Sequence, residues 1–315
     1  MAQSLVRTLK RVLVLASVTM LAGCGDDLSL PALPAFANLN AVSEELFRAA
    51  DARARESPSA ESFGSLGMLY HAYRFLEEGR VCYELARRSD PGDFRWIYYG
   101  AMLEKTGYRY EASETLFIRA LEMRPDDAEL LAELGDLYLM WARPGDARES
   151  LERSLRLDPL QPVAALGKAR LAMLEEKWSE ILAILLPLLD RFPRLSRGHQ
   201  FLAAAYGALG DEEKQETHRV AGEYGSAVES PLMRDLHELA VPAILNGDAS
   251  AGPELLKTKC ARCHDQERII ERDADRLFWA RTVRRMQREA GWPWLTDDEA
   301  AALVAFLSTR AGESR

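Results

Sequence analysis

Four prolines at a constant interval constrain the fold of this chain more than any other feature. Pro91, Pro125, Pro159 and Pro193 stand 34 residues apart in the 315-residue sequence. A fixed period in this range is typical of solenoids, in which each repeat is a helical unit that buries its apolar face only against its neighbours. Proline suits the end of such a unit because it cannot continue a helix. The middle of the chain is therefore predicted to be a stack of helical pairs.

Apolar and small residues recur with the same period. The recurring positions include Tyr83, Phe117, Leu151 and Leu185, together with Leu66-Gly67 and Leu134-Gly135. This pattern resembles the tetratricopeptide repeat. The resemblance implies an all-α solenoid of about five repeats over residues 41–225, with a groove that docks a peptide or partner protein. We expect a helix near Ser43–Arg55 to shield the first unit, a one-residue slip in unit two, and about two extra residues before Trp178 in unit four.

A Cys-x-x-Cys-His string near the carboxyl end is the most specific chemical signal. Cys260 and Cys263 can each form a thioether with a vinyl group of one haem, and His264 then ligates the iron from the proximal side. The same string could instead bind zinc, act as a redox dithiol or arise by chance. Zinc would need two further soft ligands, but no cysteine or histidine follows His264. We therefore expect one covalent haem c.

A helical pattern after this string offers a second axial ligand. Met286 is the only methionine that follows His264, and at about 100° per residue it shares one helix face with Trp279 and Val283. Met286 as the distal iron ligand would suit an electron carrier; the alternative is that it is a core residue. The opposite face carries four arginines that we expect to face solvent: Arg281, Arg284, Arg285 and Arg288.

The W-x-x-T-V-x-x-M spacing of Trp279–Met286 resembles monohaem cytochrome c domains, in which the methionine binds the iron. The resemblance implies a small cytochrome c-like helical domain over residues 248–312. Its entering helix would be Gly252–Lys259, and Thr296–Glu299 forms a capping box that opens the closing helix. Further expected contacts are Leu256 against Phe306 where these helices cross, and Trp292 at a haem edge.

The amino terminus predicts export. The apolar run Val12–Leu21 follows a basic start and is too short to span a bilayer, but fits the core of a signal peptide. Leu21-Ala22-Gly23-Cys24 resembles the bacterial lipobox, which implies a signal peptide over residues 1–23 and a diacylglycerol on Cys24. The alternative is a plain secretory signal. Residues 24–40 are expected to form a tether, and residues 226–247 a connector.

These features predict a periplasmic c-type cytochrome, lipid-anchored to a membrane, that relays single electrons. Residues 251–295 carry ten Lys or Arg against seven Asp or Glu on a chain of net charge −9, so a redox partner is expected to dock at the haem face or the repeat groove. No nucleic-acid partner is expected. The alternative is a scaffold or assembly factor with a structural or sensory haem. The repeats hold no catalytic set, and their histidines are expected to be isolated: His71, His199 and His218.

Overall fold

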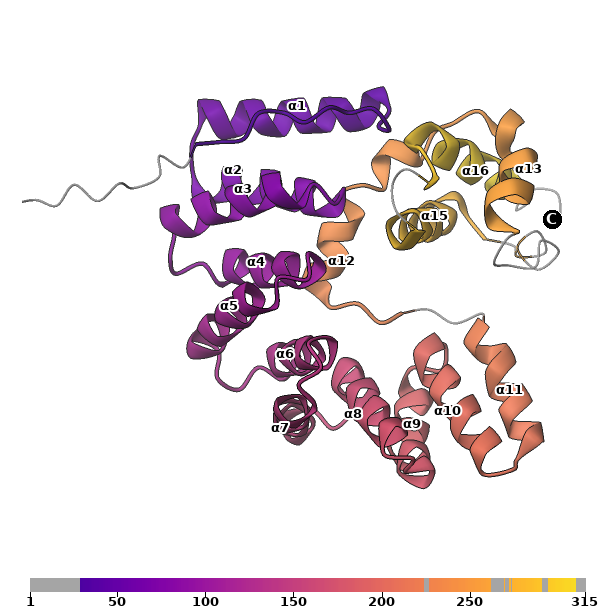
Figure 1. Cartoon of the computed structure of the whole chain (residues 1–315). Coiled ribbons are helices and arrows are strands. Elements are labelled where there is room, and N and C mark those ends of the chain that lie inside the picture. The colour runs from indigo at the N-terminus through magenta and orange to yellow at the C-terminus, as the bar shows by residue number, and fades with distance from the viewer. Residues whose placement is uncertain are drawn as a thin grey trace, which may run out of the picture.

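Every regular element in the part of the chain that the structure describes is a helix (Figure 1). The structure is a computed structural model that describes residues 29–223, 227–261, 269, 272, 274–290 and 294–309. The first helix, α1 (Ala41–Glu56), is capped by Asn40, whose side chain accepts a hydrogen bond from Ser43 N at 3.0 Å. No helix within these ranges has the length and apolar character that a bilayer span requires.

Five helical pairs follow α1 at a constant period. Their first helices are α2 (Ala60–Ala72), α4 (Phe94–Thr106), α6 (Ala128–Met140), α8 (Pro162–Leu174) and α10 (Ser196–Ala208). Their second helices are α3 (Leu76–Ser89), α5 (Tyr110–Met123), α7 (Pro144–Leu157), α9 (Trp178–Arg191) and α11 (Glu212–Glu223). Equivalent helices begin 34 residues apart throughout. The five pairs form an all-α solenoid of the tetratricopeptide type.

The constant period overturns two details of the predicted repeat. Neither the one-residue slip in unit two nor the extra residues in unit four occur, because α4 and α9 begin in register with their equivalents. Gly107 caps α4 at the position where Tyr73 caps α2. The irregularity in unit two is therefore a change of residue type without a change of register.

A left-handed residue in each unit reverses the chain between its two helices. These residues have φ between 56° and 80° and are Arg74, Tyr108, Ala142, Glu176 and Gly210. The next amide closes the end of the first helix by bonding to a carbonyl five residues earlier, as in Phe75 N to Tyr70 O at 2.9 Å. Four of the five are not glycine. Helix packing therefore outweighs the local preference for glycine at this turn.

Small residues on the first helix allow the two helices of a unit to approach closely. A Cβ added at Gly135 of α6 would lie 2.6 Å from Leu151 of α7, and one at Gly67 of α2 would lie 2.8 Å from Tyr83 of α3. Both Leu151 and Tyr83 are fully buried. The predicted packing of small residues against large ones is confirmed at these two units.

Residues 29–40 run along the first unit. Phe36 stacks on Phe47 of α1 with ring centroids 5.1 Å apart, and Leu30 and Leu33 pack against the core of the array. Arg55 Nη2 donates to the Pro31 carbonyl at 2.8 Å. This stretch is held by apolar burial, so the predicted tether does not continue to Asn40.

The chain ends in a connector and a small C-terminal domain. The connector contains α12 (Pro231–Glu238) and the 3₁₀ turn η1 (Pro242–Ile244). The domain contains η2 (Ala249–Ala251), α13 (Gly252–Leu255), the π-helical turn η3 (Leu256–Cys260), α15 (Arg276–Ala290) and α16 (Asp297–Thr309). Its separate apolar core includes Leu256, Trp279, Val283 and Leu303.

The closing helix α16 begins with the predicted capping box. Thr296 N donates to Glu299 Oε2 at 2.9 Å, and Glu299 N donates to Thr296 Oγ1 at 3.2 Å. At Gly252 of α13 an added Cβ would clash with the side chain of Phe306 of α16. Glycine permits this close approach because it has no side chain. Leu256 and Phe306 belong to the same apolar core, and their direct contact stays a prediction.

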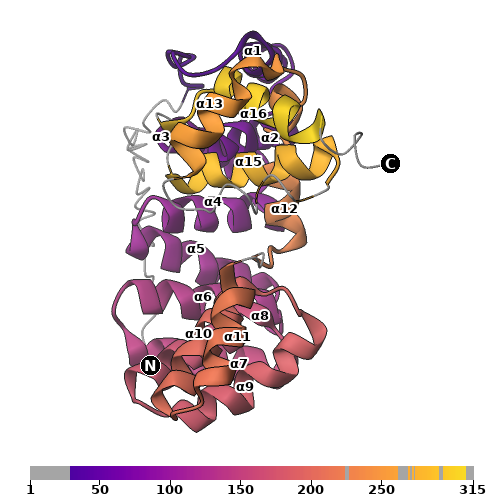
Figure 2. The same cartoon turned by 90° about the vertical axis from the view of Figure 1, so that its right-hand side faces the viewer.

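The C-terminal domain folds back onto the amino-terminal end of the array. Figures 1 and 2 show α15 and α16 beside α1 and α2, far from α11 at the end of the repeats. Asn40 Nδ2 donates to the Ala243 carbonyl at 2.8 Å, and Asp297 N donates to the Asn38 carbonyl at 3.1 Å. The connector therefore has to return along the array before the domain begins.

Candidate functional site

The connector occupies the array face formed by the first helices of units one to three. Figure 1 shows α12 beside α4. Met233 and Leu236 of α12 are buried in the apolar core that also contains residues of α2 and α4. The Tyr99 hydroxyl of α4 donates to the Leu232 carbonyl at 3.0 Å. This is the face on which a tetratricopeptide array would bind a peptide.

Polar contacts fix the start of α12 on the same face. The Tyr98 hydroxyl donates to Glu129 Oε1 of α6 at 2.8 Å and shares a second hydrogen bond with Ser230 Oγ at 3.0 Å. Burial is the main cause that raises the pKa of Glu129. Tyr98 and Tyr99 are both buried, and each forms a hydrogen bond to the connector. The groove expected for a partner is thus filled by the chain itself in its first three units.

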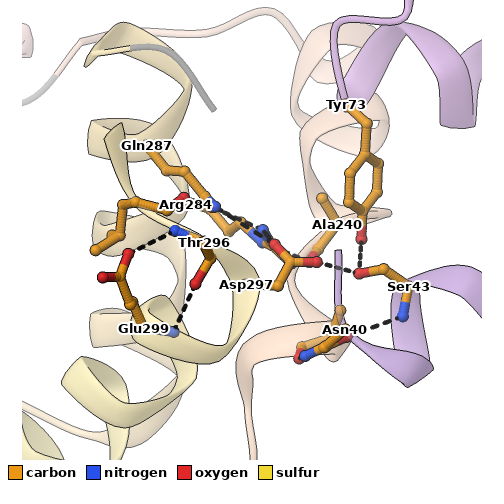
Figure 3. Close-up of polar contacts among 11 residues, drawn as sticks. Asn40, Ser43, Tyr73, Ala240, Arg284, Gln287, Thr296, Asp297 and Glu299 are labelled. Atoms are coloured by element: carbon orange, nitrogen blue, oxygen red, sulfur yellow. Dashed lines mark hydrogen bonds and ion pairs between the residues drawn. The ribbon is translucent and has the colours of Figure 1, made fainter. Parts of the chain in front are cut away.

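A buried polar cluster joins the C-terminal domain to the first unit (Figure 3). Arg284 of α15 pairs with Asp297 of α16, and Asp297 also accepts a hydrogen bond from Ser43 of α1. Arg284 Nε donates to the Ala240 carbonyl of the connector at 2.7 Å. Ser43 Oγ lies 2.9 Å from the Tyr73 hydroxyl of unit one. Four separate parts of the chain meet at this cluster.

Arg284 does not face solvent as the helical pattern predicted. Its side chain is 3% exposed, and that of Asp297 is fully buried. The reason is that α15 has neighbours on two sides, with Trp279 and Val283 in the domain core and Arg284 toward the array. By contrast, Arg281 is exposed and pairs with Glu238 of the connector at 2.6 Å. The helical pattern does not reveal the second neighbour, because the array lies far away along the chain.

The structure describes only part of the predicted haem site. Cys260 is half-buried and packs against the same apolar core as Trp279 and Val283 of α15. Met286 is half-buried on α15. Cys263, His264 and Trp292 lie outside the described residues, as does the predicted lipidation site Cys24. The described half of the site therefore brings one thiol and two residues of the predicted helix face onto one core.

Two buried donors on α15 bear on whether the predicted site fits a haem. The indole Nε1 of Trp279 and the Nε of Arg285 are buried without a hydrogen-bond acceptor among the residues that the structure describes. Buried donors of this kind normally have partners, and haem carries two carboxylates that accept hydrogen bonds. The helix also takes a π-helical turn directly before Cys260, where Ala261 N donates to the Leu256 carbonyl at 3.0 Å. Such turns frequently occur at functional sites.

Two of the three array histidines, which were predicted to be isolated from one another, are in contact. His199 Nδ1 lies 2.8 Å from His218 Nδ1, which joins α10 to α11. His71 of α2 is 4% exposed, and its Nδ1 lies 3.4 Å from the Tyr83 hydroxyl. Burial, together with the positive charges of His237, Arg74 and Arg288, lowers the pKa of His71 to about 3. Within the described ranges, no three His, Cys, Asp or Glu side chains gather into a group that could hold a metal ion.

The sequence matches no known family and no curated protein. Solved structures with a similar helical arrangement include PilF of Pseudomonas aeruginosa, with 17% identity, coverage of 56% of this chain and 88% of that chain, and a TM-score of 0.47. A tetratricopeptide repeat protein from Parabacteroides merdae has 17% identity, coverage of 64% and 80%, and a TM-score of 0.49. YrrB, a TPR protein with an unusual peptide-binding site, has 18% identity, coverage of 62% and 98%, and a TM-score of 0.43. The helical period and the turn geometry of this chain define its array as tetratricopeptide-type.

Proposed function

We propose that this chain is a tetratricopeptide-type interaction scaffold that holds a haem-bearing domain beside its first unit. The observation that carries the proposal is the unbroken 34-residue spacing of five first helices. Such spacing builds one continuous face, of which the connector covers the first three units. The fold-back of the C-terminal domain fixes that domain at the unit-one end of the array.

The partner is proposed to bind units four and five through an acidic segment. Units four and five have different side chains at the repeat positions that contact the connector in units two and three. The residue equivalent to Glu129 is Arg197, and the residue equivalent to Tyr98 is Leu166, each two repeats further along the chain. Arg170 lies on the same helix as Leu166, one turn further on. Arg170 and Arg197 are exposed, and neither pairs with an acid among the described residues. This combination of arginine and leucine favours a peptide with acidic and apolar side chains.

The C-terminal domain is proposed to carry one haem c. Cys260 and Cys263 would hold the ring by thioethers, His264 and Met286 would ligate the iron, and Trp279, Val283 and Trp292 would pack on the ring. A haem held by these residues supplies one-electron chemistry, which suits a redox partner on the array. The half-buried Cys260 and the buried indole N–H of Trp279 support this assignment.

Residues 1–23 are proposed to direct export to the bacterial periplasm, with Cys24 as a lipid anchor to a membrane. The basic start, the ten-residue apolar run and the Leu-Ala-Gly-Cys string support this proposal. An extracytoplasmic location agrees with covalent haem attachment at Cys260 and Cys263.

Chemical crosslinking of the full-length protein in its native membranes, followed by mass spectrometry, tests the scaffold proposal. We expect crosslinks from α8 and α10 to an acidic partner segment, and at least a tenfold loss of that partner in the R170E/R197E variant. Arg156→Glu, at an exposed site on the second helix α7, is the matched control and should retain the partner. Equal partner recovery with R170E/R197E would overturn the assignment of this face.

A further inference from the structure

A cavity lies where the array, the connector and the C-terminal domain meet. Its volume is about 450 Å³. His71 and Arg74 line it from the end of α2, and Tyr108 lines it from the turn after α4. Met233 and His237 line it from α12, and Arg288 lines it from α15. The cavity is therefore bounded by three parts of the chain that are far apart in sequence.

Positive charge dominates the lining. Arg74 is exposed and has no acidic partner among the residues that the structure describes. Arg288 Nη2 and His237 Nδ1 both lie 3.2 Å from the same carboxylate, that of Glu229. Glu229 therefore contacts two of the lining residues, and Arg74 adds a positive charge of its own. The lowered pKa of His71 is consistent with this, because Arg74, Arg288 and His237 all act on it.

The helix ends at the cavity do not cancel this charge. The carboxyl ends of α2 and α4 bring partial negative charge, which would oppose an anion. However, carbonyls in their last turns already accept hydrogen bonds within the chain-reversing turns, from Phe75 N to Tyr70 O and from Arg109 N to Glu104 O, both at 2.9 Å. The full charges of Arg74 and Arg288 therefore outweigh the residual dipole.

We propose that this cavity binds a small organic oxyanion, a carboxylate or a phosphate. Arg74 from the array and Arg288 from the C-terminal domain would hold the oxyanion, since planar guanidinium groups match both carboxylate and phosphate. Met233 and the ring of Tyr108 provide an apolar wall for the body of the ligand. A cavity of this volume lies in the range that small-molecule sites occupy.

The ligand would also strengthen the docking of the C-terminal domain. It would contact the array and α15 at the same time, and such a ligand binds the docked arrangement better than a separated one. Binding therefore stabilises the docked arrangement by an amount that grows with the logarithm of ligand concentration above Kd.

Thermal unfolding and calorimetric titration of the full-length protein test the proposal. The probes are inorganic phosphate, succinate and, at matched ionic strength, sodium chloride. With phosphate or succinate we expect a saturable isotherm in the calorimetric titration and a Tm that rises with the logarithm of concentration, and neither effect with chloride. Arg74→Gln and Arg288→Gln should each weaken binding by about 10- to 100-fold, the effect of losing one charged hydrogen-bonding group. Arg156→Gln, outside the cavity, should bind as the wild type does.

The outcomes separate the possible ligands. A response to phosphate alone assigns a phosphorylated ligand, and a response to succinate alone assigns a carboxylate. No saturable response to either probe, or unchanged binding in Arg74→Gln, overturns the proposal. Arg74 is exposed at a turn, so its variant keeps the test valid even if Arg288→Gln disturbs the packing of α15.

Discussion

Arg284 and Asp297 form an ion pair from which water is almost wholly excluded, with side chains 3% and 0% exposed. Gln287 supports the pair by accepting from Arg284 Nη1 at 2.7 Å and donating to the Leu295 carbonyl at 2.7 Å. Because Asp297 also bonds Ser43, the pair links the C-terminal domain to α1. A buried pair of this kind depends on complete hydrogen bonding, so loss of one partner is costly.

Arg284→Met should lower the free energy of unfolding by about 3–5 kcal/mol, because it leaves the carboxylate of Asp297 buried without its cation. Urea unfolding monitored by circular dichroism measures the change. Arg281→Met is the matched control on the same helix, and it removes only an exposed pair with Glu238, worth less than about 1 kcal/mol. Similar losses in the two variants would contradict the buried link.

Gly252→Ala should destabilise the C-terminal domain by about 1–3 kcal/mol, since the added methyl group collides with Phe306 at the crossing of α13 and α16. Gly145→Ala on α7 is the control, because nothing lies within 4 Å of a Cβ at that position. That control should be neutral or gain up to about 1 kcal/mol from the better helix propensity of alanine. Differential scanning calorimetry distinguishes the two outcomes, and a neutral Gly252→Ala would argue against the close crossing.

His71 should make stability depend on pH below 6.5. Its pKa is lowered to about 3 in the folded protein from 6.5 for the free group, mainly by burial. Between these values the unfolded chain binds a proton that the folded chain does not, so stability is complete above pH 6.5 and falls as the pH falls toward 3. From pH 7.5 to 5.0, His71 accounts for about 2 kcal/mol of the loss.

His71→Asn tests this by removing the titrating group. The difference in free energy of unfolding between pH 7.5 and 5.0 should shrink by about 2 kcal/mol relative to the wild type. Urea unfolding at the two pH values gives the comparison. An unchanged difference would mean that His71 is accessible to protons in the folded state.

The local features of this fold follow from the sequence, and its long-range contacts do not. The proline period predicted the paired helices, and Thr296 with Glu299 predicted the start of α16, because these signals act within one or two turns of chain. The burial of Arg284 was missed because its partners come from the connector, from α16 and from Tyr73 of unit one. His199 and His218 were judged isolated because their contact depends on the packing of α10 against α11, which spacing alone does not reveal.

The candidate site also combines features that the sequence predicted with features that it did not. The helical period predicted that Trp279, Val283 and Met286 share one face. The structure puts Trp279 and Val283 in the core that Cys260 also contacts. The position of α12 in the groove was not predicted, because the residue pattern of such a short segment does not indicate which surface it covers. Met286 as an iron ligand stays a prediction, as do the roles of Cys263, His264 and Trp292.

A covalent haem is the most direct test of the account. The full-length protein should be produced in bacteria able to attach c-type haem, denatured, separated by electrophoresis and stained for haem. The wild type and the control Cys82→Ala should give a haem-stained band, since Cys82 is buried in α3 away from the proposed site. The C260A/C263A variant should give none. A colourless wild type of unmodified mass would contradict the haem assignment and leave a scaffold without a redox centre.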